Sequence, residues 1–225
     1  MNINFIGIGG AFNVELGNNA SYIIEKTKIL FIDMGLDTFD KIVKYNILKN
    51  IEEIYVVITH LHGDHVGGLP TFIQYVNAKY QKKVNLISNS NSFTNCLETL
   101  LNITGVHKEE YNYIKLENIP FDFKLILKPT SHTKELECFS LIFETKEGNI
   151  LYTSDSNDFD YVKEKINDDR FIKIYSEVGE NVSSHIEYKD IKNLDSKKLV
   201  LMHIINMDLY KKIIEDGFDV PPHLK

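Results

Sequence analysis

Two hydrophobic periodicities alternate along this chain. Short apolar runs rich in β-branched and aromatic residues, about four to eight residues long, are typical of buried strands. Longer segments with apolar residues at every third or fourth position are typical of amphipathic helices. The first pattern predicts strands at residues 2–7, 21–25, 28–33, 55–58, 84–88, 111–114, 121–127, 138–143, 150–153, 171–177 and 198–204. The second predicts helices at residues 38–50, 69–80, 92–101, 189–194 and 207–217.

The loop from residue 59 to residue 69 carries the densest group of chemically active side chains. It reads Thr-His-Leu-His-Gly-Asp-His-Val-Gly-Gly-Leu, between a predicted strand and a predicted helix. Such loops hold functional side chains on a rigid scaffold. Imidazole nitrogen together with carboxylate oxygen suits Zn, Mn or Fe, so we expect one metal ion at His60 and His62. A second is expected at Asp64 and His65, and a metal-free, His-rich surface loop is the alternative.

This loop resembles the H-x-H-x-D-H signature of the metallo-β-lactamase fold superfamily. The resemblance implies an α/β (α+β) fold, the αββα sandwich, with two mixed β-sheets face to face, helices outside and metals at one edge. Members of the superfamily hydrolyse β-lactams, thioesters, lactones and phosphodiesters, so the fold does not fix the substrate.

Three more residues at predicted strand ends fall where the superfamily places its remaining ligands: His132, Asp155 and His203. Taken alone, each would be an ordinary polar residue after a strand, or a histidine packed against the sheet. The resemblance implies two divalent cations, with Zn²⁺ expected and Mn²⁺ as the alternative, and Asp155 bridging them. The implied ligands are His60, His62 and His132 for the first cation and Asp64, His65 and His203 for the second. Two metals at such a site favour ester and phosphodiester cleavage by an activated water.

Within the superfamily the chain resembles the ribonuclease Z-like branch. It has Ser154-Asp155 where β-lactamases have a cysteine ligand, and it has an extra histidine, His185. The branch resemblance implies that His185 binds the scissile phosphate and protonates the leaving oxygen, while Asp64 orients or deprotonates the water. A polar residue at a helix start is the other interpretation of His185. Asp33-Met34-Gly35 resembles the family's D-x-G, in which the acid supports the metal loop.

The net charge and the lack of a recognisable basic arm narrow the range of expected substrates. The net charge of -7 argues against a general nucleic-acid binder, because binding to RNA depends on Lys and Arg. The basic arm with which ribonuclease Z grips transfer RNA is not recognisable in the sequence. The chain resembles the compact anti-Pycsar cyclic-nucleotide phosphodiesterases. The resemblance rests on the loop 9–13, on the pair Asn18-Asn19, and on an acidic chain without the basic arm. This resemblance implies a homodimer in which a partner loop completes the pocket.

We therefore expect a metal-dependent hydrolase that converts 3′,5′-cyclic nucleotides, including cyclic CMP and cyclic UMP, to nucleoside monophosphates. In this interpretation it is an immune-evasion enzyme with a small-molecule substrate and no stable nucleic-acid partner. Three alternatives stay open. They are a transfer-RNA 3′ endonuclease, a lactone or thioester hydrolase, and a protein that sequesters nucleotides without turnover.

The remaining features concern the number of domains, the cellular location and the cysteines. Its 225 residues, without repeats or linkers, predict one domain over residues 1–225. No signal peptide and no run long enough to span a membrane is recognised, so we expect no membrane association and a cytoplasmic location, in the host cytoplasm if a phage encodes it. Cys96 and Cys138 do not suggest a disulfide framework.

Overall fold

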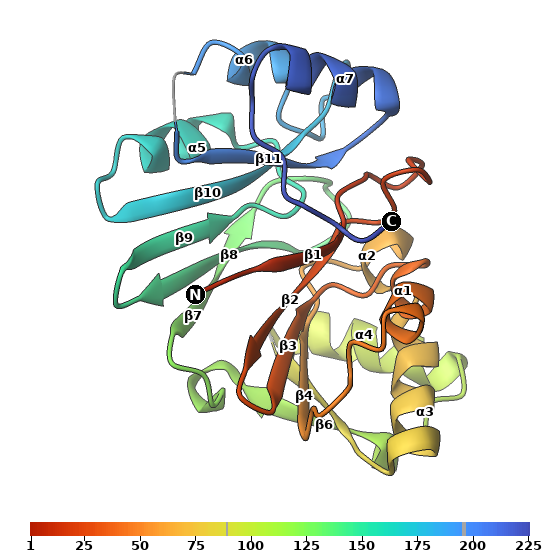
Figure 1. Ribbon diagram of the computed structural model, residues 1–225. Coiled ribbons are helices and arrows are strands. Elements are labelled where there is room, and N and C mark those ends of the chain that lie inside the picture. Colours follow the sequence, from red (N-terminus) through yellow and green to blue (C-terminus); the bar gives the residue numbers. More distant parts are fainter. Residues whose placement is uncertain (89, 195–196) are drawn as a thin grey trace.

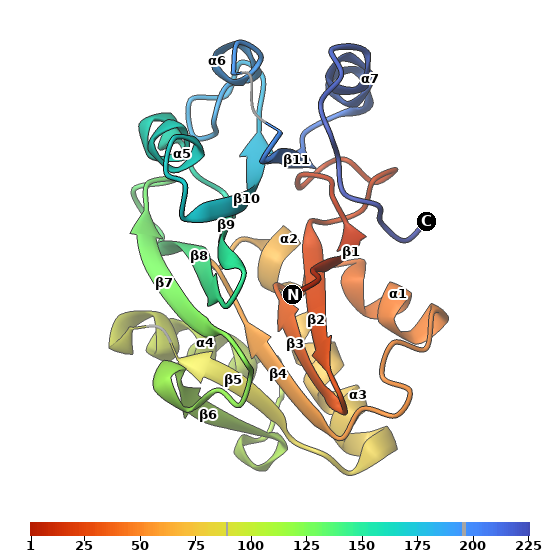
Figure 2. The same cartoon turned by 60° about the vertical axis from the view of Figure 1, so that its left-hand side comes forward.

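A computed structural model describes residues 1–88, 90–194 and 197–225 and arranges them as two sheets face to face, with helices on the outer faces (Figures 1 and 2). The first sheet has the order β1-β2-β3-β4-β5-β6, with strands Asn4–Gly7, Ala20–Glu25, Lys28–Ile32, Glu53–Val57, Val84–Ser88 and Tyr111–Lys115. The second has the order β11-β10-β9-β8-β7, where β7 to β11 are Lys124–Thr130, Cys138–Thr145, Gly148–Tyr152, Phe171–Val178 and Leu199–Ile204. The αββα sandwich expected from the metal-loop motif is confirmed.

Helices cover both outer faces of the sandwich. The α-helices α1 to α7 are Thr38–Lys44, Gly63–Val66, Leu69–Tyr80, Asn91–Ile103, Phe159–Ile166, Tyr188–Ile191 and Met207–Glu215, and the 3-10 helices η1 and η2 are Lys108–Glu110 and Leu116–Asn118. Figure 2 shows α1, α3 and α4 beside the first sheet and α5, α6 and α7 beside the second. Among the described residues, no helix is both long enough and apolar enough to cross a membrane.

The central strands of the first sheet are apolar on both faces, because each face contributes to a different core. In β3, Leu30 and Ile32 belong to the core between the two sheets. Their neighbours Ile29 and Phe31 belong to the core beneath α1, α3 and α4. Successive side chains of a strand point to opposite faces. A strand that is covered on both faces therefore reads as a continuous apolar run.

Strand direction brings the polar strand ends together. Strands β3, β4, β5 and β6 run parallel, and so do β9, β10 and β11. In open parallel sheets, ligands bind at the carboxyl ends of the strands. The loops that follow β3, β4, β9 and β10 carry the polar residues described next.

Candidate metal centre

Asp33, directly after β3, holds the loop that follows β4. Its Oδ1 accepts a hydrogen bond of 2.7 Å from the backbone N–H of Thr59, and its Oδ2 accepts one of 2.8 Å from the Thr59 hydroxyl. Oδ2 also lies 2.8 Å from Nδ1 of His65, which sits on the short helix α2. Asp33 is fully buried, so these contacts are shielded from water. They are the supporting contacts that the D-x-G pattern predicts.

The second sheet supplies His132 between β7 and β8, Asp155 after β9 and His203 within β11. Ser154, the residue before Asp155, donates a hydrogen bond of 2.6 Å to the hydroxyl of Thr59. This bond joins the end of β9 to the loop after β4. The two sheets therefore hold one polar cluster between them.

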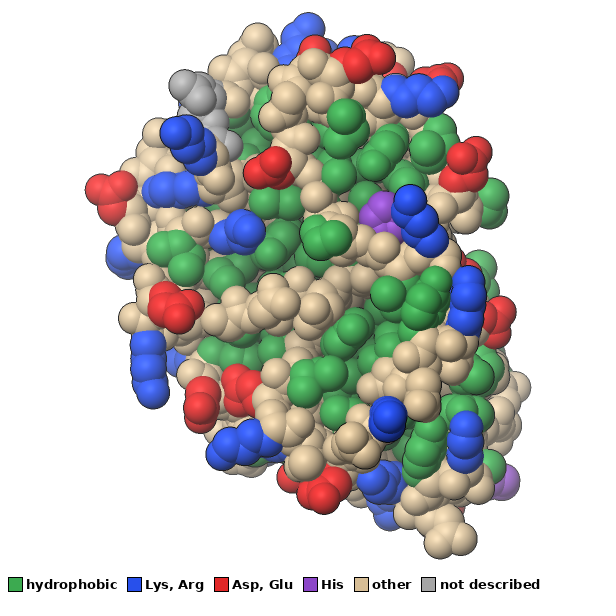
Figure 3. All heavy atoms as spheres, viewed as in Figure 1, with side chains coloured by type: hydrophobic (Ala, Val, Ile, Leu, Met, Phe, Trp, Pro, Cys, Tyr) green, Lys and Arg blue, Asp and Glu red, His purple; other side chains and the backbone are tan. Residues whose placement is uncertain are grey.

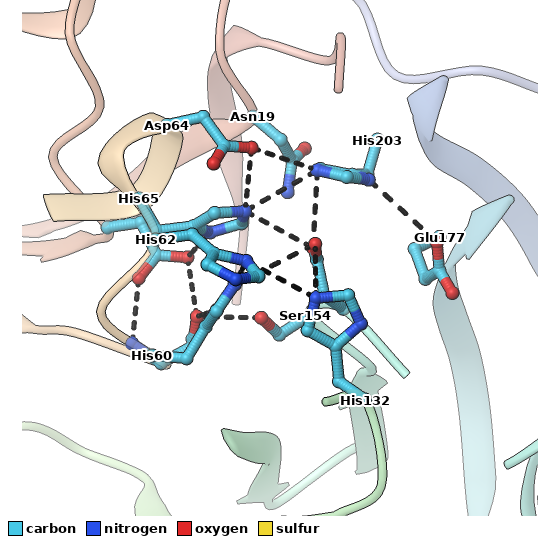
Figure 4. A network of polar contacts seen from close by, with 12 residues as sticks. Asn19, His60, His62, Asp64, His65, His132, Ser154, Glu177 and His203 are labelled. Carbon is cyan, nitrogen blue, oxygen red and sulfur yellow. Dashed lines mark hydrogen bonds and ion pairs between the residues drawn. The ribbon is translucent and has the colours of Figure 1, made fainter. Parts of the chain in front are cut away.

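The structure brings all seven predicted ligands together in what we term the histidine–aspartate cluster: His60, His62, Asp64, His65, His132, Asp155 and His203. They form two groups that share Asp155, and within each group the potential ligand atoms lie within 4.8 Å of one another. The first group adds His60, His62 and His132 to Asp155, and the second adds Asp64, His65 and His203. Figure 4 shows the side chains of the six residues that it labels from this cluster pointing toward one another: His60, His62, Asp64, His65, His132 and His203.

Distances within the cluster fit divalent cations. Nδ1 of His62 lies 3.0 Å from Nε2 of His60 and 3.3 Å from Nε2 of His132, so three imidazole nitrogens converge. Oδ1 of Asp155 is buried and lies 3.2 Å from Nε2 of His65 and 3.3 Å from Nε2 of His203, so a carboxylate oxygen and two imidazole nitrogens converge in the second group as well. A buried carboxylate oxygen is costly unless it is paired or coordinates a metal. The donor set of imidazole nitrogen and carboxylate oxygen therefore has the chemistry of a divalent-metal site.

Burial and charge shift the pKa values in the cluster. Burial lowers the pKa of His60 well below its usual value, and the neighbouring His65 lowers it further. His60 is therefore neutral, which is the form of imidazole that binds metals. Burial also opposes ionisation of Asp155, but the charges of His203 and His65 outweigh it and hold the pKa of that carboxyl well below its usual range.

His185 lies beside the cluster and is held by a residue that the sequence did not single out. Its Nδ1 is 2.7 Å from Oε2 of Glu177, and its ring centroid is 4.9 Å from that of His132. Glu177 is fully buried, and its Oε1 accepts a hydrogen bond of 2.7 Å from the backbone N–H of Ile186. Burial lowers the pKa of His185, but the hydrogen bond and the charge of Glu177 outweigh it and raise the pKa above its usual value.

A cavity of about 630 Å³ opens over the cluster. Its floor includes His62, Asp64, His132, Asp155, His185 and His203. Apolar side chains line it as well, among them Phe12, Leu36, Val182 and Ile205. Within the described part of the chain, no Lys or Arg lines this cavity.

The sequence matches a known family over most of its length. A sequence model described as anti-Pycsar protein Apyc1 matches residues 1–218. This chain belongs to the anti-Pycsar protein Apyc1 family. The family expected from the metal loop, the N-terminal loop and the acidic frame is thereby confirmed.

Individual members of this family and its neighbours match more locally. The anti-Pycsar protein Apyc1 of Paenibacillus sp. (strain J14) is 40% identical over 70 residues, which cover 31% of this chain and 28% of that protein. The ribonuclease Z of Bacillus licheniformis is 30% identical over 112 residues, or 48% of this chain and 36% of that protein. These matches thus span only about a third of the relatives' own length.

A solved structure matches over nearly the full length. The metallo-beta-lactamase fold protein YhfI from Bacillus subtilis superposes with a TM-score of 0.73 at 14% sequence identity, covering 95% of this chain and 90% of that one. At so low an identity the likeness establishes the fold alone.

Proposed function

We propose that this protein is a metal-dependent phosphodiesterase that hydrolyses 3′,5′-cyclic nucleotides to nucleoside monophosphates. One observation carries the proposal: two groups of ligand atoms share Asp155, and His185, which buried Glu177 holds at Nδ1, lines the same cavity. Two adjacent cation sites with a separate proton donor are what the in-line displacement at a phosphodiester requires.

The seven residues of the histidine–aspartate cluster would hold two divalent cations, with Zn²⁺ expected. When bound, such ions lower the pKa of water and neutralise charge on the phosphoryl oxygens. Asp64 lines the cavity, where it would orient the attacking water or accept its proton. Glu177 occupies Nδ1 of His185, which leaves Nε2 to donate a proton to the departing ribose oxygen. Glu177 acts here as a positioning residue, because it fixes the orientation of the imidazole.

Size and charge support a small, singly charged substrate. A volume of about 630 Å³ falls within the usual range of small-molecule sites, roughly 300–1,000 Å³. The described lining contributes neither Lys nor Arg, so it offers little to a polyanion. On the face shown in Figure 3, Lys and Arg are interspersed with Asp and Glu rather than gathered into one basic patch. These features favour a cyclic nucleotide over transfer RNA.

The other two alternatives fit less well. A lactone or thioester hydrolase needs no phosphate-binding histidine, whereas His185 lies 4.9 Å from His132 between ring centroids. A protein that only sequesters nucleotides does not need two complete groups of metal ligands. Following the family resemblance, we also propose that cyclic CMP and cyclic UMP are among the substrates, which would make this a cytoplasmic immune-evasion enzyme.

The decisive experiment measures turnover of cyclic CMP, cyclic UMP, cyclic AMP and cyclic GMP, and of precursor transfer RNA, with Zn²⁺ or Mn²⁺. The variants are Asp64→Ala, His185→Ala and Glu177→Gln, with His107→Ala as the matched control, because His107 is exposed and does not line the cavity. Loss of a general acid or base lowers kcat by about 10²- to 10⁴-fold. We expect that loss for Asp64→Ala and His185→Ala, a smaller one for Glu177→Gln, and none for His107→Ala.

The same assay separates the alternatives. Cleavage of transfer RNA without cleavage of cyclic nucleotides would make the protein a processing nuclease. Tight nucleotide binding without turnover would make it a sequestering protein. An unchanged kcat in His185→Ala, at unchanged metal content, would remove His185 from the mechanism.

We further propose a homodimer, on the resemblance of this chain to dimeric relatives. The chain mass is 26.0 kDa, so light scattering should report about twice that value. A mass equal to one chain at micromolar concentration would refute the dimer without touching the chemistry proposed above.

A further inference from the structure

The most exposed hydrophobic side chain that lines the cavity is that of Phe12. Phe12 is 94% exposed, the highest value for a large hydrophobic residue in the described chain, and it lines the cavity together with His62 and Asp64. Exposed apolar groups that rim a polar site are typical of ligand-binding surfaces. The proposed mechanism does not use Phe12, so its position needs another explanation.

The loop that carries Phe12 is fixed at its base. Asn13 is buried, and its Nδ2 donates a hydrogen bond of 3.0 Å to the carbonyl of Ile204 in β11. The backbone N–H of Gly10 donates one of 3.0 Å to the same carbonyl. Figure 1 shows this loop, between β1 and β2, beside the end of β11. Phe12 is therefore presented by a held turn rather than by a free chain.

The same loop packs directly on the histidine–aspartate cluster. A Cβ atom added at Gly10 would lie 3.3 Å from Cε1 of His203, which leaves little room for any side chain there. Phe12 follows two positions later in the chain. Phe12 lines the same cavity as His62, Asp64 and His203 of the cluster.

Other lining residues give the rim an apolar character. Leu36 is 66% exposed and Val182 is 37% exposed, and both border the cavity that Phe12 borders. A phosphodiester at the cluster leaves the rest of the nucleotide near this rim. The only part of a nucleotide that benefits from an aromatic and aliphatic surround is the flat face of its base.

We propose that Phe12 is the specificity-determining residue that stacks on the base of the substrate, with Leu36 and Val182 completing an apolar base pocket. This inference rests on the proposed cyclic-nucleotide function. Base–aromatic stacking contributes roughly 5- to 150-fold in affinity per base, which is the reported 1–3 kcal/mol at 1.4 kcal/mol per tenfold change. Stacking forms equally in the ground state and the transition state, so its loss raises KM and leaves kcat unchanged.

Val14 provides a matched control. It lies in the same turn and is 89% exposed, but it does not line the cavity. The test compares wild type, Phe12→Ala, Phe12→Trp and Val14→Ala in the Zn²⁺-loaded protein. Steady-state kinetics gives KM and kcat, calorimetric titration gives the Kd of the monophosphate product, and light scattering gives the mass.

We expect Phe12→Ala to raise KM and the product Kd roughly 5- to 150-fold at constant kcat. Phe12→Trp should retain wild-type values, and Val14→Ala should change neither. A Phe12→Ala variant with the KM and Kd of wild type overturns the inference. So does an equal loss in Phe12→Ala and Val14→Ala together with a change in mass, because that result makes the turn a contact between chains.

The binding arm keeps the two proposals distinguishable. If wild type binds nucleotide without hydrolysing it, the proposed phosphodiesterase function fails, and a weaker Kd in Phe12→Ala still supports stacking. If wild type hydrolyses cyclic nucleotides and Phe12→Ala is unaffected, the function stands and the stacking inference fails. A wild-type protein with neither binding nor turnover overturns both.

Discussion

Three residues of the candidate metal centre have left-handed backbone angles although none is glycine. The φ angles of Asp33, Ser154 and His203 are 64°, 53° and 50°. Each such residue costs of order 1–3 kcal/mol and persists only where its surroundings fix it. Here hydrogen bonds to Thr59 hold Asp33 and Ser154. The fold thus keeps strained backbone at one predicted ligand, His203, and at two residues that adjoin or support the others, Ser154 and Asp33.

Asp33→Asn should weaken metal binding without removing a predicted ligand. The amide keeps the size of the carboxylate but replaces one acceptor with an N–H₂ group facing Thr59 and His65, which Asp33 now contacts at 2.8 Å. Changes of this kind cost roughly 10- to 100-fold in metal affinity. A competition titration with a chromophoric zinc chelator measures the change. Asp40→Asn, an exposed substitution in α1, serves as the control.

If Asp33→Asn bound zinc as tightly as Asp40→Asn, the supporting role of Asp33 would be wrong. A folded variant is needed for this comparison, because Asp33 is fully buried. A near-ultraviolet circular dichroism spectrum like that of wild type would establish this.

At the scale of elements, the hydrophobic pattern located most strands and helices but not their ends. The predicted helix 69–80 coincides with α3, because its apolar stripe faces one core throughout. The predicted helix 38–50 is shorter in the structure, where α1 ends at Lys44. The predicted strand 121–127 lies three residues later, and β7 runs through Pro129. Proline is tolerated there because β7 is an edge strand, which no local pattern reveals.

The candidate site was predictable only where a motif or a strand end marked it. Four of the predicted ligands lie together in the loop 59–69. His132, Asp155 and His203 were predicted because they fall where the superfamily places its remaining ligands. Glu177 gave no such signal, because it sits at the end of an apolar strand with no motif around it. Its link to His185 depends on a chain path of eight residues that returns to β10. Helix α5 was missed as well, since half of the residues in this short amphipathic segment are charged.

Ser90→Ala should destabilise α4 measurably. The Ser90 side chain caps the helix by accepting a hydrogen bond of 3.0 Å from the backbone N–H of Phe93. Losing such a cap costs about 0.5–2 kcal/mol. Ser92→Ala is a matched control, because Ser92 is exposed in the first turn of the same helix. Urea denaturation should show a lower free energy of unfolding for Ser90→Ala and a change within about 0.5 kcal/mol for Ser92→Ala. Equal values for the two variants would contradict the capping role.

At the scale of the whole molecule, the candidate metal centre connects the two sheets. His60 and His62 follow β4 of the first sheet, whereas His132, Asp155 and His203 belong to the second. The backbone N–H of Phe139 in β8 also donates a hydrogen bond of 3.1 Å to the carbonyl of Thr59. A cation held by residues of both sheets would link them, so its binding would stabilise the folded state in addition to its proposed role in hydrolysis.

Removing divalent metal should therefore lower the melting temperature. A ligand that binds only the folded state stabilises it by about 4 kcal/mol when its free concentration is 1,000 times Kd. In a chain of this size, 1 kcal/mol shifts the melting temperature by roughly 2–4 °C, which gives a difference of roughly 8–16 °C between the zinc-loaded and the chelator-treated protein. Calorimetry at matched pH and ionic strength measures this difference.

Asp155→Ala should lose most of the zinc-dependent rise in melting temperature, because Asp155 belongs to both ligand groups. His107→Ala, whose histidine is exposed and belongs to none of the ligand groups, should retain it. A zinc response of equal size in Asp155→Ala and wild type would place the stabilising ion elsewhere on the protein.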